Sequence, residues 1–273
     1  MTKQITFYHS PDADDAFMFY GFHAGIIDMP GYSFSHELCD IESLNKRALE
    51  GKLDATAISI AQYPIVKAQY KMLSSGASMG GKDYGPRVVS KEKGIMFSKK
   101  TGLKIAIPGE FTSTTKAIKA YLKENNITAE LVPVFFEEIF DAINKGTVDA
   151  GAIIHEGQLT YAAEGFSLEV DLGKWWWDKT GLPLPLGINI VNRNLGEDGM
   201  RAVAAALKES ITFALQNRSS ALDYALSYGR GLNKTDADVF VGMYVNDWTE
   251  DLGEKGKESI QLFLTDDVSN CFI

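Results

Sequence analysis

A histidine at the end of an apolar run is the first feature of this sequence that could do chemistry. The stretch VDAGAIIHEG reads as a buried strand that stops at His155 and Glu156. A histidine placed there can exchange a proton near neutral pH, because its unperturbed pKa is about 6.5. The alternative is a structural histidine that ties strand to loop through hydrogen bonds, and the residue taken alone favours that alternative.

A second candidate is the run of hydroxyl residues Thr112, Ser113 and Thr114, which follows the loop PGEF at the start of a predicted helix. The first turn of a helix has unpaired backbone N–H groups and the positive end of the helix dipole, so this position is suited to a carboxylate or a phosphate. Arg87 or Lys116 could add positive charge to such a site. The structural alternative is an ordinary N-cap.

Polar residues also follow the strands in the first half of the chain. The loop HSPDADD, which includes Asp15, comes directly after the first predicted strand, and Ser59 ends the strand DATAIS. Asn45 lies on the helix between these two strands. Ligands bind at the carboxyl ends of strands in open α/β sheets, so these residues form a third candidate group.

The elements that position these residues alternate along the chain. Short apolar strands are followed by longer amphipathic segments with turn residues between them, which indicates an α/β fold with largely parallel sheets. We predict strands at 4–10, 54–60, 102–109, 129–134 and 148–155, and helices at 14–26, 41–51, 63–73, 112–126, 137–146, 199–218, 220–230, 235–246 and 256–268.

The two halves of this alternation resemble each other. The segments ALEGKLDATAIS and AINKGTVDAGAII share a helix end with glycine and the pattern Asp-Ala-x-Ala-Ile. Asp54 therefore corresponds to Asp149, and Ile58 corresponds to Ile153. The repeat predicts two lobes of similar plan.

The helical segments after residue 190 break this repeat, and we expect them to pack back on the first lobe. The predicted first lobe is then discontinuous and comprises 1–100 and 190–273, and the second lobe comprises 101–189. Two hinge crossovers would join the lobes, and the three candidate groups would line one central cleft.

Composition and net charge limit the classes of protein to which this chain can belong. The chain has 273 residues, 45% of them hydrophobic, which suffices for one large or two modest cores. With 27 basic and 36 acidic residues the net charge is −9 and no basic run occurs, so nucleic acid and an anionic membrane are poor partners. Neither a signal-peptide core of about 7 to 15 apolar residues nor an apolar run of about 18 is present, so we expect a cytoplasmic location. Cys39 and Cys271 lie far apart without metal-ligand spacing.

Several longer motifs connect the histidine to a known family. The segments GAIIHEGQLTYAAEGF, VDLGKWWWDKTGLPLPLGINIVNR, DIESLNKRALEGKLDATAIS and IAIPGEFTSTT resemble the 1,4-dihydroxy-6-naphthoate synthase family of menaquinone biosynthesis. The similarity runs through nearly the whole chain. The opening loop SPDADD departs from the commoner family form, in which Ser-Pro is followed by Cys-Pro-Asn-Asp, because only Asp15 of those four residues is kept.

The resemblance implies a two-lobed periplasmic-binding-protein-like (type II) fold and an enzyme of the futalosine route. That family converts cyclic dehypoxanthine futalosine to 1,4-dihydroxy-6-naphthoate and dihydroxyacetone, without metal or organic cofactor. The expected partner is therefore a small-molecule substrate with a carboxylate. On this resemblance His155 is the catalytic general base. The positions expected to line the substrate site are Asp15, Asn45, Ala57, Ile58, Ser59, Thr112, Ser113, Thr114 and Ile154.

Other functions stay open at this point. A chorismate dehydratase of the same fold would act on a different substrate, a non-catalytic solute-binding protein would bind without turnover, and a ligand sensor would need a protein partner. Asp12 and Asp14 receive no role from the sequence, and the run from Trp175 to Trp177 is expected to be mostly packing.

Overall fold

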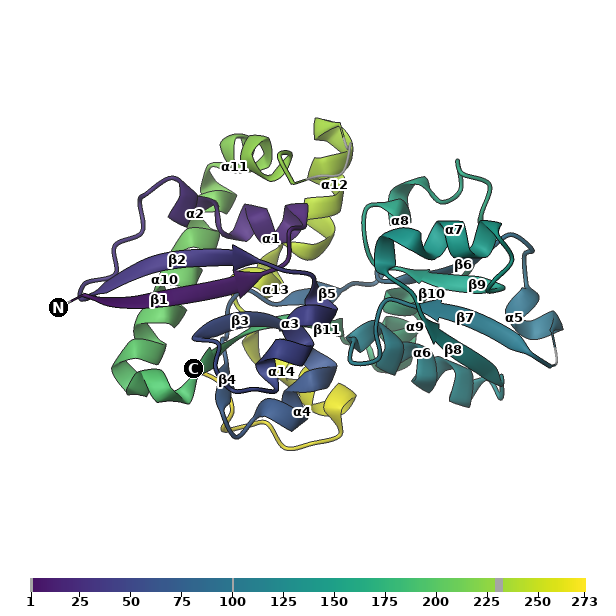
Figure 1. Ribbon diagram of the computed structural model, residues 1–273, viewed down its shortest axis with the longest axis horizontal. Coiled ribbons are helices and arrows are strands. Elements are labelled where there is room, and N and C mark those ends of the chain that lie inside the picture. The colour runs from purple at the N-terminus through teal and green to yellow at the C-terminus, as the bar shows by residue number, and fades with distance from the viewer. Residues whose placement is uncertain (1, 100, 229–232) are drawn as a thin grey trace. The chain divides into compact units, whose positions relative to one another are not determined.

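Two compact α/β units make up the chain (Figure 1). The computed structural model describes residues 2–99, 101–228 and 233–273. The first unit comprises Met1–Met79 and Pro185–Ile273, and the second comprises Gly80–Leu184. Each unit is built on a single mixed sheet with helices packed against it.

The sheet of the first unit has the strand order β2-β1-β3-β11-β4, and β5 also pairs with β11. β1 runs parallel to β2 and β3, whereas β11 runs antiparallel to β3 and β4. The strands are β1 Lys3–His9, β2 Tyr32–Leu38, β3 Ala55–Ser59, β4 Tyr70–Met72, β5 Ser78–Gly80 and β11 Leu184–Asn192.

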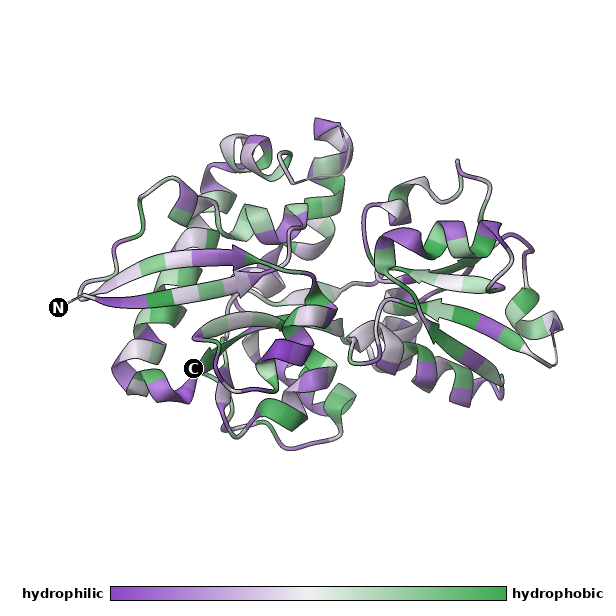
Figure 2. Cartoon of the chain, viewed as in Figure 1, coloured by the Kyte–Doolittle hydropathy of each residue, from purple (hydrophilic) through white to green (hydrophobic). Residues whose placement is uncertain are grey.

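Helices from both ends of the chain cover this sheet. In α1, Phe17 and Met18 are fully buried and pack in one cluster with Leu207 and Ile211 of α10. Figure 2 shows hydrophobic and hydrophilic residues alternating along α10, as expected for a helix with one buried face. The helices are α1 Ala13–Met18, α2 Tyr20–His23, α3 Ile41–Ala48, α4 Tyr63–Val66, α10 Gly196–Gln216, α11 Arg218–Ala225, α12 Lys234–Tyr244, α13 Asp247–Glu250 and α14 Gly253–Leu264, with 3-10 turns η1 Ile60–Gln62 and η3 Arg193–Leu195.

The sheet of the second unit has the order β10-β6-β9-β7-β8. β7 runs parallel to β8 and β9, and β6 runs antiparallel to β9 and β10. The elements are β6 Arg87–Ser90, α5 Ile95–Ser98, β7 Leu103–Ile107, α6 Ser113–Glu124, β8 Ala129–Pro133, η2 Phe136–Glu138, α7 Ile139–Asn144, β9 Ala150–Ile153, α8 Gly157–Thr160, β10 Ser167–Asp171 and α9 Leu172–Thr180.

The predicted internal repeat is present in the backbone of both units. Asp54 precedes β3 and accepts a hydrogen bond from the backbone N–H of Thr6 in β1, at 3.0 Å. Asp149 precedes β9 and accepts one from the backbone N–H of Lys104 in β7, at 2.8 Å. Each aspartate thus ties the start of its own strand to the opening strand of its unit, so the two residues that the sequence motifs paired hold equivalent positions.

The structure corrects several expectations about the elements. The predicted helix at 63–73 ends at Val66, because Tyr70 and Met72 are buried in β4, which pairs with β11. The predicted helix at 14–26 is two short helices that meet at Phe19. Both sheets are mixed rather than largely parallel, since β6 and β11 pair antiparallel with their neighbours.

The observed boundary between the units also differs from the predicted one. The sequence placed 81–100 in the first lobe, but β6 pairs with β9 and β10, so 81–99 belong to the second unit. Residue 100, the predicted boundary, lies outside the described residues, as do 229 and 230 at the end of the helix predicted at 220–230.

Candidate functional site

The second unit gathers its candidate residues at one edge of its sheet. β7, β8 and β9 are mutually parallel, so their carboxyl ends meet at the same edge. The loop that leads to Thr112 follows β7, Phe135 and Phe136 follow β8, and Ile154 and His155 follow β9. The sequence predicted that His155 and the hydroxyl run come from this part of the fold.

His155 is held by the turn that follows it. Its Nδ1 accepts a hydrogen bond from the backbone N–H of Gly157 at 3.0 Å, and its carbonyl accepts one from the N–H of Gln158 at 2.9 Å. The rings of Phe136 and Phe140 lie 5.9 and 6.0 Å from the imidazole, centroid to centroid. The imidazole is therefore fixed in orientation and flanked by two apolar rings.

Gly157 makes room for this arrangement. A Cβ atom at this position would lie 2.7 Å from Cε1 of His155 and 2.7 Å from Cε2 of Phe140. Both distances are shorter than van der Waals contact, so any side chain here would displace one ring or the other. The Gly in the motif His-Glu-Gly is thus required by the position of the histidine.

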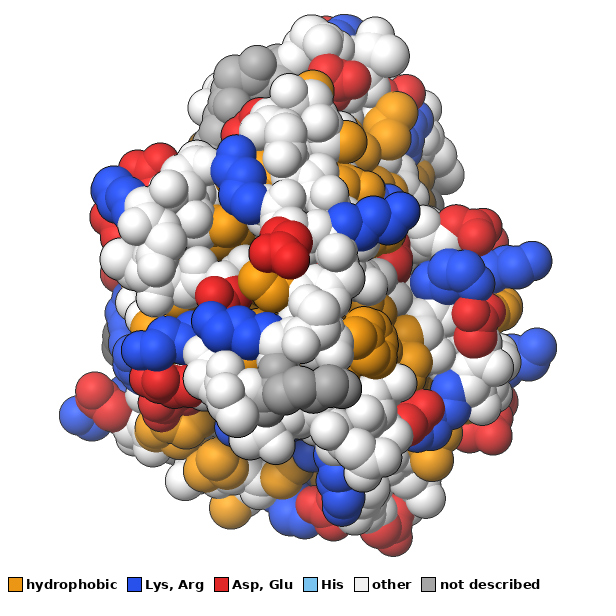
Figure 3. Space-filling view, turned by 90° about the vertical axis from the view of Figure 1, so that its right-hand side faces the viewer, with side chains coloured by type: hydrophobic (Ala, Val, Ile, Leu, Met, Phe, Trp, Pro, Cys, Tyr) orange, Lys and Arg blue, Asp and Glu red, His pale blue; other side chains and the backbone are white. Residues whose placement is uncertain are grey.

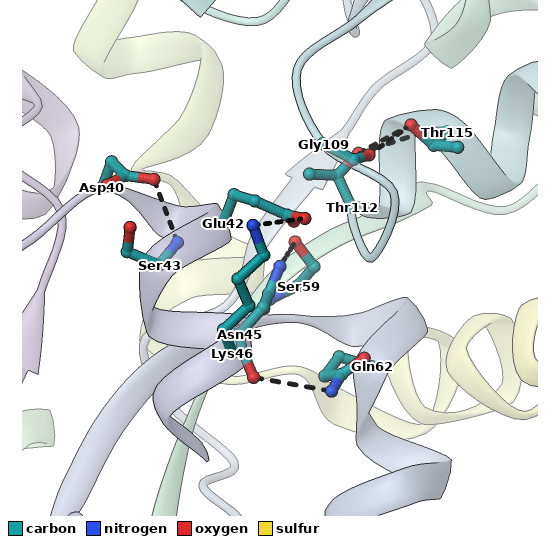
Figure 4. A network of polar contacts seen from close by, with 10 residues as sticks. All are labelled: Asp40, Glu42, Ser43, Asn45, Lys46, Ser59, Gln62, Gly109, Thr112 and Thr115. Carbon is teal, nitrogen blue, oxygen red and sulfur yellow. Dashed lines mark hydrogen bonds and ion pairs between the residues drawn. The ribbon is translucent and has the colours of Figure 1, made fainter. Parts of the chain in front are cut away.

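Thr112 is the N-cap of α6, and its hydroxyl is used within the turn (Figure 4). Its Oγ1 accepts from the backbone N–H of Thr115 at 3.2 Å and lies 3.0 Å from the carbonyl oxygen of Gly109. The hydroxyl of Thr115 donates to the same carbonyl at 2.7 Å. Ser113 and Thr114 are buried in the first turn of α6. The capping alternative therefore holds for Thr112.

In the first unit, Asn45 and Ser59 form a buried pair (Figure 4). Nδ2 of Asn45 donates to Oγ of Ser59 at 3.0 Å, and its Oδ1 accepts from the backbone N–H of Ser59 at 2.8 Å. Nε2 of Gln62 donates to the Asn45 carbonyl at 3.5 Å. These bonds fix the end of β3 against α3. Ala57 and Ile58 precede Ser59 in β3, and the Ile58 side chain is fully buried.

The first turn of α1 carries a carboxyl group with a shifted pKa. Burial raises the pKa of Asp15 well above its usual range, and the neighbouring Asp14 and Asp12 raise this pKa further, whereas a backbone hydrogen bond from Ser10 lowers it. The hydroxyl of Ser10 donates to Asp12. Asp15 lies in the first turn of α1, and the sequence did not predict the raised pKa of its carboxyl group.

Arg87 is held by an ion pair and by a backbone carbonyl. Its Nε donates to Oδ2 of Asp171 at 3.2 Å, and its Nη1 donates to the carbonyl of Gln158. Oδ1 of Asp171 in turn accepts from the backbone N–H of Lys174 and caps α9. Arg87 thus connects the turn after His155 with the start of α9. A structural ion pair accounts for it without any bound anion.

The aromatic neighbours of His155 were not singled out from the sequence. Phe136 is buried, and Phe140 stacks on Phe166 with ring centroids 4.6 Å apart. Their position just after β8 and in α7 is the signal that could have identified them, since β8 is parallel to the strands that carry the other candidates. The tryptophan run packs as expected: Trp176 is buried, and Trp175 meets Tyr121 edge to face at 5.6 Å.

The described part of the chain lacks two further kinds of feature. Within it, no three His, Cys, Asp or Glu side chains gather in a way that could hold a metal ion. Nor does any helix of residues 2–99, 101–228 and 233–273 combine the length and apolar character needed to cross a membrane.

Figure 3 shows acidic and basic side chains intermixed on one face of the molecule, with hydrophobic side chains in small groups among them.

Solved structures resemble this fold over its whole length. A protein from Archaeoglobus fulgidus is 38% identical in sequence and superimposes with a TM-score of 0.89, covering 96% of each chain. An alkanesulfonate-binding protein from Xanthomonas axonopodis is 13% identical and superimposes with a TM-score of 0.73, covering 99% of this chain and 98% of its own. The fold is therefore periplasmic-binding-protein-like, as the sequence motifs implied.

Sequence relatives identify the family. A protein of Thermus thermophilus named 1,4-dihydroxy-6-naphthoate synthase is 36% identical over 253 residues, which is 92% of this chain and 89% of that protein. A Streptomyces coelicolor protein of the same name is 32% identical over 97% of this chain and 92% of its own. A family model described as menaquinone biosynthesis matches residues 5–266. The chain therefore belongs to the menaquinone biosynthesis family.

Proposed function

We propose that this chain is a carbon–carbon lyase that converts cyclic dehypoxanthine futalosine to 1,4-dihydroxy-6-naphthoate and dihydroxyacetone. Two relatives that match most of the chain are named 1,4-dihydroxy-6-naphthoate synthase. The observation that carries the proposal is the position of His155, which stands at the carboxyl end of β9, oriented by Gly157 and flanked by two aromatic rings. In this proposal His155 acts directly on the reacting atoms.

The proposed reaction needs a base and hydrogen-bond donors, and the residues at this edge of the second sheet can supply them. Cleaving a carbon–carbon bond so that a ring becomes aromatic requires a proton to leave a carbon beside a carbonyl, and requires donors for the negative charge that develops on oxygen. The family resemblance gives His155 the role of general base, and a well-placed base contributes about 10² to 10⁴ in rate. Aromatisation supplies the driving force, so the proposed reaction requires no redox cofactor.

The apolar surroundings of His155 support this role. Phe136 and Phe140 contribute no charge and little polarity beside the imidazole. In such an environment a hydrogen bond to a developing charge is stronger than in water. A substrate with an aromatic or nearly aromatic ring is also chemically suited to lie beside phenylalanine rings.

The substrate carboxylate is assigned in this proposal to the start of α6. Thr112 uses its hydroxyl to cap the helix, so the carboxylate would bind the first-turn N–H groups together with the side chains of Ser113 and Thr114. Asn45 and Ser59 enter the proposal as a second group of substrate-lining residues, since their mutual hydrogen bonds hold them in one geometry. Asp15 belongs to that group because its carboxyl, with a raised pKa, is suited to proton transfer.

The test is product analysis with two substrates. Purified protein is incubated separately with cyclic dehypoxanthine futalosine and with chorismate, and the products are identified by mass spectrometry. We expect 1,4-dihydroxy-6-naphthoate from the first and unchanged chorismate from the second. Formation of 3-enolpyruvylbenzoate from chorismate would identify the chain as the dehydratase instead, and binding of either compound without turnover would indicate a solute-binding protein.

A further inference from the structure

Phe135 is an exposed aromatic residue at the edge of the second sheet where the other candidate residues of this unit gather. It follows β8, and the backbone N–H of Val134 donates to the carbonyl of Ile107, at the end of β7, at 3.0 Å. The carbonyl of Phe135 accepts from the N–H of Glu138 at 2.8 Å, which closes the turn η2. The backbone on both sides of Phe135 is thus fixed, yet the residue is 50% exposed.

The ring of Phe135 packs on the ring of Phe136, with centroids 4.7 Å apart and planes tilted by 52°. Phe136 is buried, and its ring lies 5.9 Å from the imidazole of His155, centroid to centroid. Both distances are in the range that aromatic pairs prefer. Phe136 therefore links the imidazole to an exposed aromatic ring at the same edge of the sheet.

We propose that Phe135 is a substrate-binding residue whose exposed ring packs against the ring system of the substrate while His155 acts as the base. The proposal rests on the proposed function, in which the product is a naphthoate, a bicyclic aromatic ring with a carboxylate. Contact between the Phe135 ring and such a ligand removes apolar surface of both from water and aligns their rings. Phe135 would therefore favour ligands that carry a ring over acyclic anions of the same charge.

The charges next to Phe135 indicate which part of the substrate it would contact. Glu137 and Glu138 follow closely in the sequence, and both are exposed. Two carboxylates beside Phe135 would repel a substrate carboxylate but would not repel an uncharged ring. Phe135 is thus suited to the uncharged part of the ligand, and the carboxylate is left to the start of α6, as in the proposed function.

Phe97 offers a matched control in the same unit. It is also 50% exposed, and it lies in α5. Lys99, which follows α5, forms an ion pair with Asp149 at 2.7 Å, and Asp149 precedes β9, so α5 lies at the opposite end of this strand from His155. Figure 1 shows α5 and α8, the helix after His155, at opposite ends of the second unit. Phe97 therefore shares the exposure of Phe135 but not its place beside the candidate site.

The test compares three variants, Phe135→Ser, Phe135→Tyr and Phe97→Ser, in steady-state kinetics with cyclic dehypoxanthine futalosine. A ring contact that is equally strong in the ground state and the transition state changes KM rather than kcat. We expect Phe135→Ser to raise KM about tenfold with little change in kcat, and Phe135→Tyr, which keeps a ring, to stay close to wild type. Phe97→Ser should leave both constants unchanged. An unchanged KM in Phe135→Ser, or an equal rise in Phe97→Ser, would overturn the proposal.

Calorimetry with 1,4-dihydroxy-6-naphthoate separates this proposal from the proposed function. We expect the affinity of Phe135→Ser for the naphthoate to fall about tenfold and that of Phe97→Ser to stay at the wild-type value. If the wild type turns nothing over but its naphthoate binding still depends on Phe135, the lyase assignment fails and the ring contact stands. If the wild type is active and Phe135→Ser binds the naphthoate as tightly as the wild type does, the ring contact fails and the lyase assignment stands. A wild-type protein that neither turns over nor binds overturns both.

Discussion

Nε2 of His9 lies 3.1 Å from Nδ1 of His36, and the two imidazoles form a short hydrogen-bonded chain at the end of β1. Nδ1 of His9 lies 2.9 Å from the carbonyl oxygen of Ser10, which can only accept, so His9 donates there and accepts from His36. Burial lowers the pKa of His9 to about 4; the Ser10 carbonyl acts to raise this pKa, and the proximity of His36 lowers it.

This buried histidine should make the protein sensitive to acid. An unfolded histidine binds a proton near pH 6.5, whereas folded His9 does so only near pH 4, so the unfolded state takes up the extra proton in between. The stabilising contribution is present above pH 6.5 and is lost as the pH falls towards 4. Each pKa unit is equivalent to 1.36 kcal/mol, so the difference between the unfolded and folded pKa of His9 corresponds to roughly 3 kcal/mol of unfolding free energy.

Replacing His9 should therefore make the unfolding free energy fall less steeply as the pH is lowered. His9→Asn keeps an amide N–H for the Ser10 carbonyl but does not titrate. Urea unfolding at a series of pH values from 7 to 4 would measure the difference between the wild-type and variant free energies. We expect that difference to shrink as the pH falls. A constant difference over the whole range would show that His9 does not remain neutral in the folded protein.

Gly157→Ala should impair catalysis more than stability. The new Cβ would stand 2.7 Å from the imidazole of His155 and would push it from its position. A displacement of about 1 Å at a catalytic group can cost on the order of 10² in rate. Steady-state kinetics should show the loss in kcat, with KM changed little. A variant with wild-type kcat would mean that the orientation of His155 is unimportant for turnover.

Thr112→Ala should lower stability through the loss of a helix cap. The Thr112 hydroxyl accepts from Thr115 N–H and lies beside the Gly109 carbonyl, so its removal should cost about 1 kcal/mol of unfolding free energy. Thr112→Ser is the matched control, because it keeps the hydroxyl and should stay close to wild type. Urea unfolding monitored by circular dichroism would separate the two. Equal stability of the alanine and serine variants would contradict the capping role.

Sequence alone predicted the parts of the fold that depend on local pattern and internal repetition. Asp54 and Asp149 were paired by motif, and each proved to bind the opening strand of its own unit. The errors arose where distant pairing decides the structure. Tyr70 and Met72 continue a helical pattern, but pairing with β11, more than a hundred residues away, makes them a strand. The same long-range pairing places β6 in the second sheet.

The candidate site was predictable to a similar extent. His155 was identified because it ends an apolar strand within a recognisable motif. Phe136 and Phe140 come from a different strand end and from a helix, so only the folded sheet brings their rings to the imidazole. The hydrogen bond from Gly157 depends on the geometry of one turn. No pattern of residue types specifies which nitrogen of a histidine that turn engages.

The most direct test of the account is a quantitative time course with cyclic dehypoxanthine futalosine, run in parallel with wild-type protein and His155→Ala. Product masses are quantified by mass spectrometry, and binding of the naphthoate product to both proteins is measured by calorimetry. We predict that the wild type releases 1,4-dihydroxy-6-naphthoate and dihydroxyacetone in equal amounts, and that His155→Ala binds the product with similar affinity but loses about 10² to 10⁴ in kcat. A wild-type protein that forms neither product, or a His155→Ala protein with near-normal kcat, would contradict it.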